Sequence, residues 1–134
     1  MLSGKKPTST AKLADFGLAQ ALETSGNGVS STAGTFGYQA PEIMQGKNYG
    51  TEADIWQLGC LLFAMLTVTL PVGTDEGETP NATGKRVHYD NVSLHIAGLQ
   101  YSDSCKDLLR GMLAIDPTAR MTIEQVLEHP FFYN

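Results

Sequence analysis

The sequence has few cysteines and no strongly basic stretch. Cys60 and Cys105 lie far apart and lack the spacing of a metal site, so we expect buried free thiols in a reducing compartment, the cytoplasm. No basic run is longer than Lys5-Lys6 or Lys85-Arg86, and the net charge is -5. This charge pattern argues against a nucleic-acid partner and against an anionic membrane surface.

Long apolar runs are also absent. The N-terminal stretch "MLSGKKPTST" has no apolar signal core, which argues against secretion. The run of apolar or small residues at 58–66 is far shorter than the roughly 20 residues that a membrane-spanning helix needs. With 134 residues, of which 42% are hydrophobic and 17% charged, the sequence indicates one globular domain with one core.

The strongest helical signal covers residues 51–70. Residues 58–66 are apolar or small on every side, which is typical of a helix at the centre of a core, and Thr51 or Asp54 is placed to cap its start. A short helix is expected from Pro41, because proline suits the first turn. Residues 23–34, "ETSGNGVSSTAG", predict a loop. Between 71 and about 99 we predict no helix or strand, because glycines and prolines interrupt any regular spacing of apolar residues.

The last third of the sequence predicts two further helices. In "SDSCKDLLRGMLAI" one helical face carries apolar residues, and Ser102 or Asp103 is placed to cap its start; the face consists of Leu108, Leu109, Met112 and Leu113. Thr122, three residues before Gln125, indicates a capping box that opens a short final helix, and Pro130 ends it.

Four motifs occur in order along the chain. They are "KLADFGLAQ" at 12–20, "GTFGYQAPE" at 34–42, "DIWQLGCLLFAML" at 54–66 and "LLRGMLAIDPTARMT" at 108–122. Together they resemble the second half of a eukaryotic-type serine/threonine protein kinase catalytic domain. The resemblance covers residues 1–134 and implies a mainly α fold, the C-lobe portion of that domain. It would have a short β-hairpin at the N-terminus, an activation loop and a small bundle of helices.

By this resemblance Asp15 is the carboxylate that binds the Mg²⁺ of ATP. A hard cation prefers oxygen ligands, and a carboxylate where a strand meets a loop can reach it. Phe16 is expected to pack inward and to set the active or inactive pose of the loop, while Gly17 permits the backbone turn. ATP and Mg²⁺ are therefore the cofactors expected of the complete domain.

Residues 15–42 correspond to the activation segment. A phosphate on one of its hydroxyls could order the loop by pairing with arginine, and Ser31 and Thr32 are favoured over Ser30 by their spacing from Gly34. Thr35 has a different implied role, because the family places the Gly-Thr pair near the substrate hydroxyl. That pair favours serine or threonine over tyrosine as the acceptor. Solvated loop hydroxyls are the alternative interpretation for residues 30–32.

Structural roles follow for residues outside the activation loop. The resemblance pairs Glu42 with Arg120 as a buried ion pair, although 77 other residues separate them in the sequence. The resemblance also implies that Asp54 hydrogen-bonds backbone amides of the catalytic loop. It further implies that Trp56 and Gly59 pack the central helix.

Several catalytic parts are missing from the sequence. It has no Gly-rich loop, no strand lysine with its helix glutamate, and no His-Arg-Asp loop, so the catalytic base is expected upstream of Met1. Met1-Leu2 fits the end of one strand, residues 3–8 a hairpin and residues 12–14 the next strand. The chain is thus expected to begin one or two residues past the catalytic Asn.

These observations predict a segment of an ATP- and Mg²⁺-dependent serine/threonine kinase that is not catalytically competent alone. The expected partner is a protein substrate or a regulatory protein. The alternative is a non-catalytic, pseudokinase-like interaction or decoy module. In either case the exposed apolar surface of a half-lobe would make the chain marginally stable or dependent on a partner.

Overall fold

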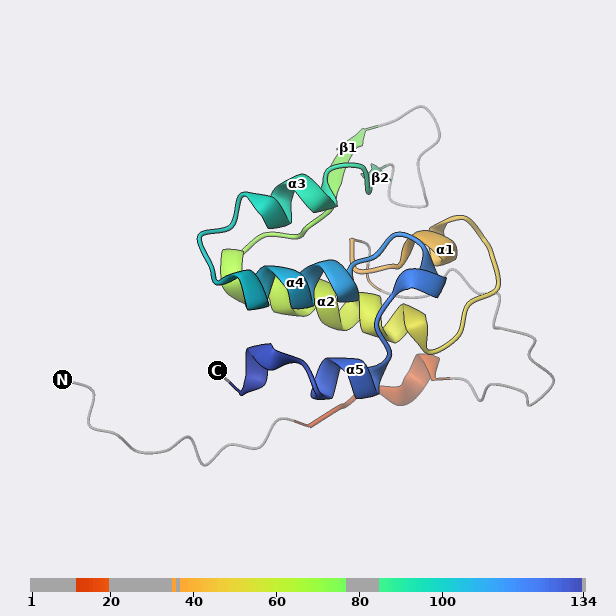
Figure 1. The fold of residues 1–134 in the computed structure, drawn as a ribbon. Helices are drawn as coiled ribbons and strands as arrows, with labels where there is room; N and C mark the ends of the chain where they lie inside the picture. The colour runs from red at the N-terminus through yellow and green to blue at the C-terminus, as the bar shows by residue number, and fades with distance from the viewer. Residues whose placement is uncertain (1–11, 20–34, 36, 77–84, 134) are drawn as a thin grey trace, which may run out of the picture.

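The computed structural model describes residues 12–19, 35, 37–76 and 85–133. Helices dominate this part of the chain, with one small sheet at the edge (Figure 1). In chain order its elements are η1 (Phe16–Leu18), α1 (Pro41–Met44), α2 (Glu52–Thr67), β1 (Gly73–Glu76), β2 (Lys85–His88), α3 (Val92–Ala97), α4 (Asp103–Met112), η2 (Pro117–Ala119), α5 (Ile123–Leu127) and η3 (Pro130–Phe132).

Helix α2 runs through the centre of the molecule, and α4 packs along it (Figure 1). Trp56 and Cys60 are fully buried, and Gly59 between them lets the two helices approach closely. A Cβ at Gly59 would stand 2.9 Å from Leu113 Cδ2 and 3.0 Å from Met112 Cβ. The central helix expected at residues 51–70 is therefore present, although it is somewhat shorter. Its small residue, Gly59, lies against the end of α4.

The start of α2 differs from the expected side-chain cap. Thr51 occupies the N-cap position, but its side chain makes no capping hydrogen bond, because its backbone is already helical (φ -66°, ψ -20°). The Glu52 carboxylate instead accepts a hydrogen bond from the Gly50 N–H at 3.0 Å. The acidic first turn, which also contains Asp54, suits the positive end of the helix dipole.

The two helices predicted in the last third are confirmed. Ser102 caps α4 by accepting from the Cys105 N–H, and the predicted apolar face is buried, with Leu108 and Leu109 at 0% exposure. The capping box of α5 is complete: Thr122 Oγ1 accepts from the Gln125 N–H, and the Gln125 side chain accepts from the Thr122 N–H. Local capping chemistry thus fixes both helix starts.

The prediction that residues 71–99 contain no element is wrong. β1 and β2 form an antiparallel ladder that pairs Gly73 with His88 and Glu76 with Lys85, and α3 follows. Asn91 at the start of α3 makes no side-chain cap bond, so the helix has no local start signal. Its stability comes from Val92 and Ile96, which are 2% and 1% exposed and pack into the core.

The expected N-terminal hairpin is not supported. Residues 1–11, which include its first strand and turn, lie outside the described residues. The second strand, expected at residues 12–14, is absent: Lys12 and Ala14 are exposed, and Leu13 is 88% exposed. A strand needs a neighbour for its backbone N–H and C=O groups, and residues 12–14 pair with no strand in the described part of the chain.

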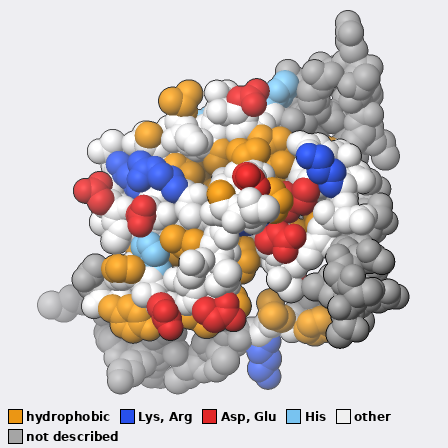
Figure 2. Space-filling view, turned by 45° about the vertical axis from the view of Figure 1, so that its right-hand side comes forward, with side chains coloured by type: hydrophobic (Ala, Val, Ile, Leu, Met, Phe, Trp, Pro, Cys, Tyr) orange, Lys and Arg blue, Asp and Glu red, His pale blue; other side chains and the backbone are white. Residues whose placement is uncertain are grey.

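Membrane-spanning helices do not occur in the described part of the chain, since no helix there combines the necessary length with apolar character. Charged side chains are interspersed on the face in Figure 2, where lysines and arginines lie in separate small groups between acidic ones.

Candidate functional site

Asp15, the predicted metal ligand, stands at the start of η1 with an exposed carboxylate. Its backbone is left-handed (φ 61°, ψ 67°), and its side chain makes no capping hydrogen bond. Gly17 lies close to the Asp15 carboxylate: a Cβ at Gly17 would stand 3.4 Å from Asp15 Oδ1. Aspartate tolerates the left-handed region better than most residues, and the resulting turn presents the carboxylate to solvent.

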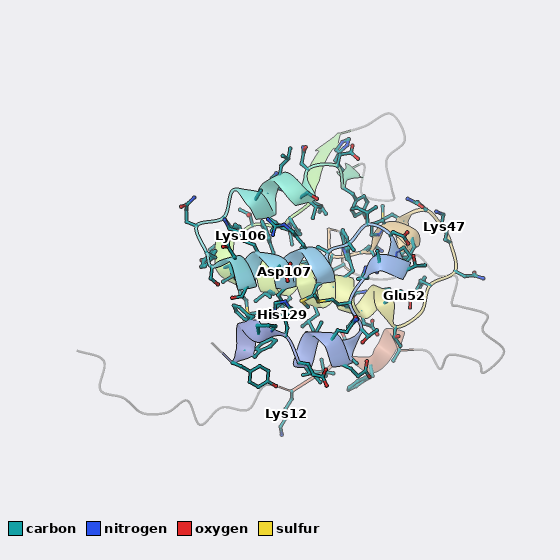
Figure 3. The ribbon with its side chains drawn as sticks, in the orientation of Figure 1. Lys12, Lys47, Glu52, Lys106, Asp107 and His129 are labelled. Atoms are coloured by element: carbon teal, nitrogen blue, oxygen red, sulfur yellow. The ribbon has the colours of Figure 1, made fainter. Side chains whose placement is uncertain are left out.

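Phe16 was expected to pack inward, but in this structure it does not. Its side chain is 68% exposed, because no core residue of the described chain covers it. Lys12, a few residues earlier, extends away from the body of the molecule (Figure 3). The inward pose of Phe16 is therefore wrong for this structure.

The described residues fit the role of a single metal ligand rather than a complete metal site. Among them, no group of three or more His, Cys, Asp or Glu side chains is arranged to hold an ion. Mg²⁺ is usually bound through one or two carboxylates together with substrate phosphates and water, so a lone exposed carboxylate is a suitable contributor. Asp15 meets that condition.

The segment from Gly37 to Glu42 is tightly fitted. Gly37 has a positive φ of 86°, which favours glycine, and a Cβ there would stand 2.6 Å from Leu70 Cδ1, so a larger residue would also have to displace the Leu70 side chain. The Tyr38 N–H donates to the Thr35 C=O at 3.2 Å, which closes a turn before α1. Thr35 itself is exposed, and the predicted phosphosites Ser30, Ser31 and Thr32 lie outside the described residues.

Arg120 holds Glu42 in a buried bidentate ion pair, as the resemblance implied. Arg120 Nη1 lies 2.7 Å from Glu42 Oε1, and Nη2 lies 3.0 Å from Oε2. Nη1 also donates to the Glu52 C=O at 2.7 Å, and Nε donates to the Ala114 C=O at 3.1 Å. The guanidinium is thereby paired and hydrogen-bonded on both sides, which compensates for its removal from water.

Trp56 packs under this ion pair. The Arg120 guanidinium lies over the indole ring at 5.2 Å from its centroid, a cation–π arrangement, and Trp56 is fully buried. Its Nε1 is buried and has no hydrogen-bond partner within the described residues. Its other neighbour is the Tyr89 ring, which meets it edge-on with centroids 5.5 Å apart.

Burial keeps the two thiols of the core protonated. Cys60 and Cys105 are buried and free, as predicted. Burial raises the pKa of Cys60 to about 12, although the Arg120 charge acts in the opposite direction. Burial also raises the pKa of Cys105. A nucleophile or metal ligand would have to be a thiolate, so neither side chain suits such a role.

Asp54 lies exposed in the first turn of α2. Partial desolvation, followed by the negative charge of Glu52, raises the pKa of its carboxyl group. The catalytic-loop amides that it was expected to bind belong to residues that this sequence does not contain. That role of Asp54 therefore stays a prediction.

Two contacts were missed by the sequence analysis. The Tyr89 hydroxyl donates to the Gln39 C=O at 3.0 Å, 50 positions away, from a segment for which no element was predicted. His129 Nε2 lies 3.3 Å from Asp107 Oδ2, and its Nδ1 accepts from the Phe131 N–H at 3.2 Å (Figure 3). The His-Pro pair at residues 129–130 is a usable signal for the Phe131 N–H bond that begins η3, but it does not indicate Asp107. Nothing local indicated the first.

Comparison with known proteins agrees with this architecture. Residues 1–132 match the protein kinase domain family. The SNF1-related protein kinase catalytic subunit alpha KIN12 of Arabidopsis thaliana is 35% identical over 123 residues, which cover 92% of this chain and 24% of that protein. The serine/threonine-protein kinase cds1 of Schizosaccharomyces pombe is 33% identical over 129 residues, covering 91% of this chain and 27% of the relative.

The chain therefore belongs to the eukaryotic-type serine/threonine protein kinase family. A third relative, the putative ribosomal protein S6 kinase alpha-1 of Caenorhabditis elegans, is 34% identical over 122 residues, covering 90% of this chain and 16% of its own length. The chain thus spans about a quarter or less of the length of these curated relatives.

Proposed function

We propose that this chain is part of a kinase that transfers the terminal phosphoryl group of ATP to serine or threonine hydroxyls of proteins, with Mg²⁺ as cofactor. The observation that carries this proposal is the exposed Asp15 carboxylate, which makes no capping hydrogen bond and precedes a Phe-Gly pair in a member of the kinase family. When bound, Mg²⁺ neutralises negative charge on the phosphates and orients them. Asp15 would supply one of its oxygen ligands.

The segment from Thr35 to Glu42 would meet the protein substrate at its exposed end. Thr35 is exposed at one end of this segment, and the Glu42–Arg120 pair fixes the other end to the core. A rigid anchor at one end favours a defined position for the exposed end, which is what the orientation of a hydroxyl for phosphoryl transfer requires.

We further propose that the 134 residues alone do not catalyse the transfer. The sequence contains no His-Arg-Asp loop and no Gly-rich loop, and phosphoryl transfer depends on the positioning that those parts supply. The partner is then a protein substrate or a regulatory protein. The two buried free thiols favour the cytoplasm as the compartment.

Control of this activity is proposed to reside in the activation segment, residues 15–42. Phosphate on Ser31 or Thr32 would add negative charge that an arginine can pair, and so order the segment. Mapping of phosphosites on protein purified from its native cell tests this proposal. Phosphate on residues 30–32 is expected, and its repeated absence from an active preparation would contradict it.

The test of the proposed reaction is an assay on the full-length protein that carries this sequence. We expect label from the γ-phosphate of ATP to appear on serine or threonine of a mixed peptide library, and chelation of Mg²⁺ to abolish it. Label confined to tyrosine would contradict the acceptor assignment. A properly folded protein that gives no label under any condition would contradict the reaction.

A second candidate, a non-catalytic interaction module, is favoured by one surface. Leu58, Leu61 and Met65 follow a helical spacing along α2 and are 41%, 46% and 67% exposed, on a helix whose other side is core. Such a stripe is typical of a face that packs against another helix. The same assay, run on the wild type and on Asp15→Asn, separates the two candidates, since phosphoryl transfer that depends on Asp15 excludes a purely non-catalytic role.

A further inference from the structure

Tyr89 lies between β2 and α3 and contacts a part of the chain that is far away in the sequence. Its hydroxyl donates to the Gln39 C=O at 3.0 Å, 50 positions earlier. Gln39 is 7% exposed and the next residue, Ala40, is fully buried, so this carbonyl group belongs to a closely packed backbone. The hydrogen bond therefore acts on a segment with little freedom to adjust.

The Tyr89 ring has a fixed position of its own. It meets the buried Trp56 ring edge-on, with centroids 5.5 Å apart and an interplanar angle of 65°. The Tyr89 C=O also accepts from the Val92 N–H at 3.2 Å, which begins α3. Because the ring and the backbone are both held, the hydroxyl is presented in one place.

The hydroxyl is suited to be a lasting donor. Burial raises the pKa of Tyr89 above its usual range, and the negative charge of Glu42 acts in the same direction. A tyrosine hydroxyl has an ordinary pKa of about 10, so this group can donate to the Gln39 C=O at neutral pH.

The segment is consequently fixed at two points. At one end Arg120 binds Glu42, and Arg120 also lies over the Trp56 ring. A few residues earlier, Tyr89 binds the Gln39 carbonyl while packing on the same Trp56 ring. Trp56 thus supports both attachments. Of the two, the attachment made by Tyr89 is nearer along the chain to the exposed Thr35.

We propose that Tyr89 is a positioning residue for the protein substrate: its hydroxyl sets the backbone of residues 37–40 through Gln39. This inference rests on the proposed function, in which the segment from Thr35 to Glu42 meets the substrate. Tyr89 itself touches no reacting atom in this account, and it acts through the position of Gln39.

Substitution Tyr89→Phe tests the inference, because it removes one hydroxyl and keeps the ring against Trp56. Tyr101→Phe is the matched control: Tyr101 also donates its hydroxyl to a backbone carbonyl, that of Leu66 at 2.8 Å, at the opposite end of α2. Both variants lose one neutral hydrogen bond of the same kind. They differ in whether that bond reaches residues 37–40.

The first measurement is amide hydrogen exchange in the full-length protein that carries this sequence, which needs no activity. In Tyr89→Phe we expect the amides of residues 37–40 to exchange about fivefold faster, the factor that corresponds to one neutral hydrogen bond. Tyr101→Phe is expected to leave them unchanged. Equal acceleration at residues 37–40 in both variants, or none in either, would overturn the inference whatever the protein catalyses.

The second measurement separates a positioning role from a merely structural one. In the full-length protein, Tyr89→Phe is expected to raise KM for a peptide substrate about fivefold, with KM for ATP and kcat within twofold of the wild type. Unchanged peptide KM, or a kcat that falls while KM stays constant, would overturn the inference. A wild-type protein that transfers no phosphate contradicts the proposed function instead, and the exchange result still decides the role of Tyr89.

Discussion

Arg120 and Glu42 are 78 positions apart in sequence, yet they form two hydrogen bonds of 2.7 and 3.0 Å in the core of the protein. The pair joins the turn after α4 to α1, and the same guanidinium binds the Glu52 C=O in the first turn of α2. A single side chain therefore ties the end of the segment from Gly37 to Glu42 to the central helix. The stability and the proposed function of the chain both depend on this contact.

Arg120→Ala should lower the free energy of unfolding by about 3–5 kcal/mol, because it leaves the buried Glu42 carboxylate without its partner. Urea unfolding of the chain, followed by the far-ultraviolet circular dichroism signal, measures this loss. Arg110→Ala is the matched control, since Arg110 is exposed on α4, and it should change stability by less than about 0.5 kcal/mol. Equal midpoints for the two variants would contradict the assigned role of the ion pair.

The close contact of α2 with the end of α4 makes Gly59 sensitive to size. In Gly59→Ala the new Cβ would meet Leu113 and Met112 at 2.9–3.0 Å, and the strain should exceed the gain in helix propensity, for a net loss of about 1 kcal/mol. Gly98→Ala is the control, because its Cβ would meet only atoms at 3.5 Å or more and its φ is -72°. That variant should keep or slightly raise the melting temperature, and a stabilised Gly59→Ala would refute the account of this contact.

Val68 ends α2 in the left-handed conformation, with φ 62° and ψ 14°, and is 93% exposed. A β-branched residue is strained there, and no packing compensates for the strain. Val68→Gly should therefore raise the free energy of unfolding by about 1 kcal/mol, whereas Val68→Ala, which keeps a Cβ, should raise it by less. Chemical denaturation of both variants checks the order, and a less stable Val68→Gly would show that the strain is absent.

Asp116 should make the stability of the chain depend on pH in acid. Its Oδ1 accepts from the Thr118 hydroxyl at 2.8 Å and from the Thr118 N–H at 2.9 Å, and these bonds lower the pKa of the carboxyl group below its ordinary value of 3.8. A lowered folded-state pKa adds stability that is present above pH 3.8 and is lost as the pH falls further.

The measurement is a series of urea midpoints between pH 6 and pH 2.5 for the wild type and for Asp116→Ala. The wild type should lose more stability than the variant below about pH 3.8, with parallel behaviour above it. Identical curves over the whole range would show that the Asp116–Thr118 hydrogen bonds contribute no such dependence.

Where capping and periodicity act locally, the sequence was sufficient to predict structure. Ser102 and Thr122 mark the starts of α4 and α5 through bonds to residues three positions later, and the apolar face of α4 follows from its own spacing. Arg120 and Glu42 were found only because their motifs resemble those of a family. No property of either residue alone indicated the other.

Contacts that depend on packing were out of reach of the sequence. α3 has no side-chain cap and forms because Val92 and Ile96 are buried by other elements. Tyr89 contributes to the site through a bond that spans 50 positions. The inward pose expected of Phe16 was carried over from the family, and in the described structure that side chain is exposed.

The central claim, that Asp15 is a metal ligand for phosphoryl transfer, is tested most directly by the substitution Asp15→Asn in the full-length protein. Asp103→Asn, which changes another exposed aspartate in the first turn of α4, is the control. We predict that Asp15→Asn lowers kcat for peptide phosphorylation by roughly a hundredfold or more, because a charge-stabilising group is lost, while Asp103→Asn stays within twofold of the wild type. Phosphorylation by Asp15→Asn at the wild-type rate and with the same Mg²⁺ requirement would contradict the account.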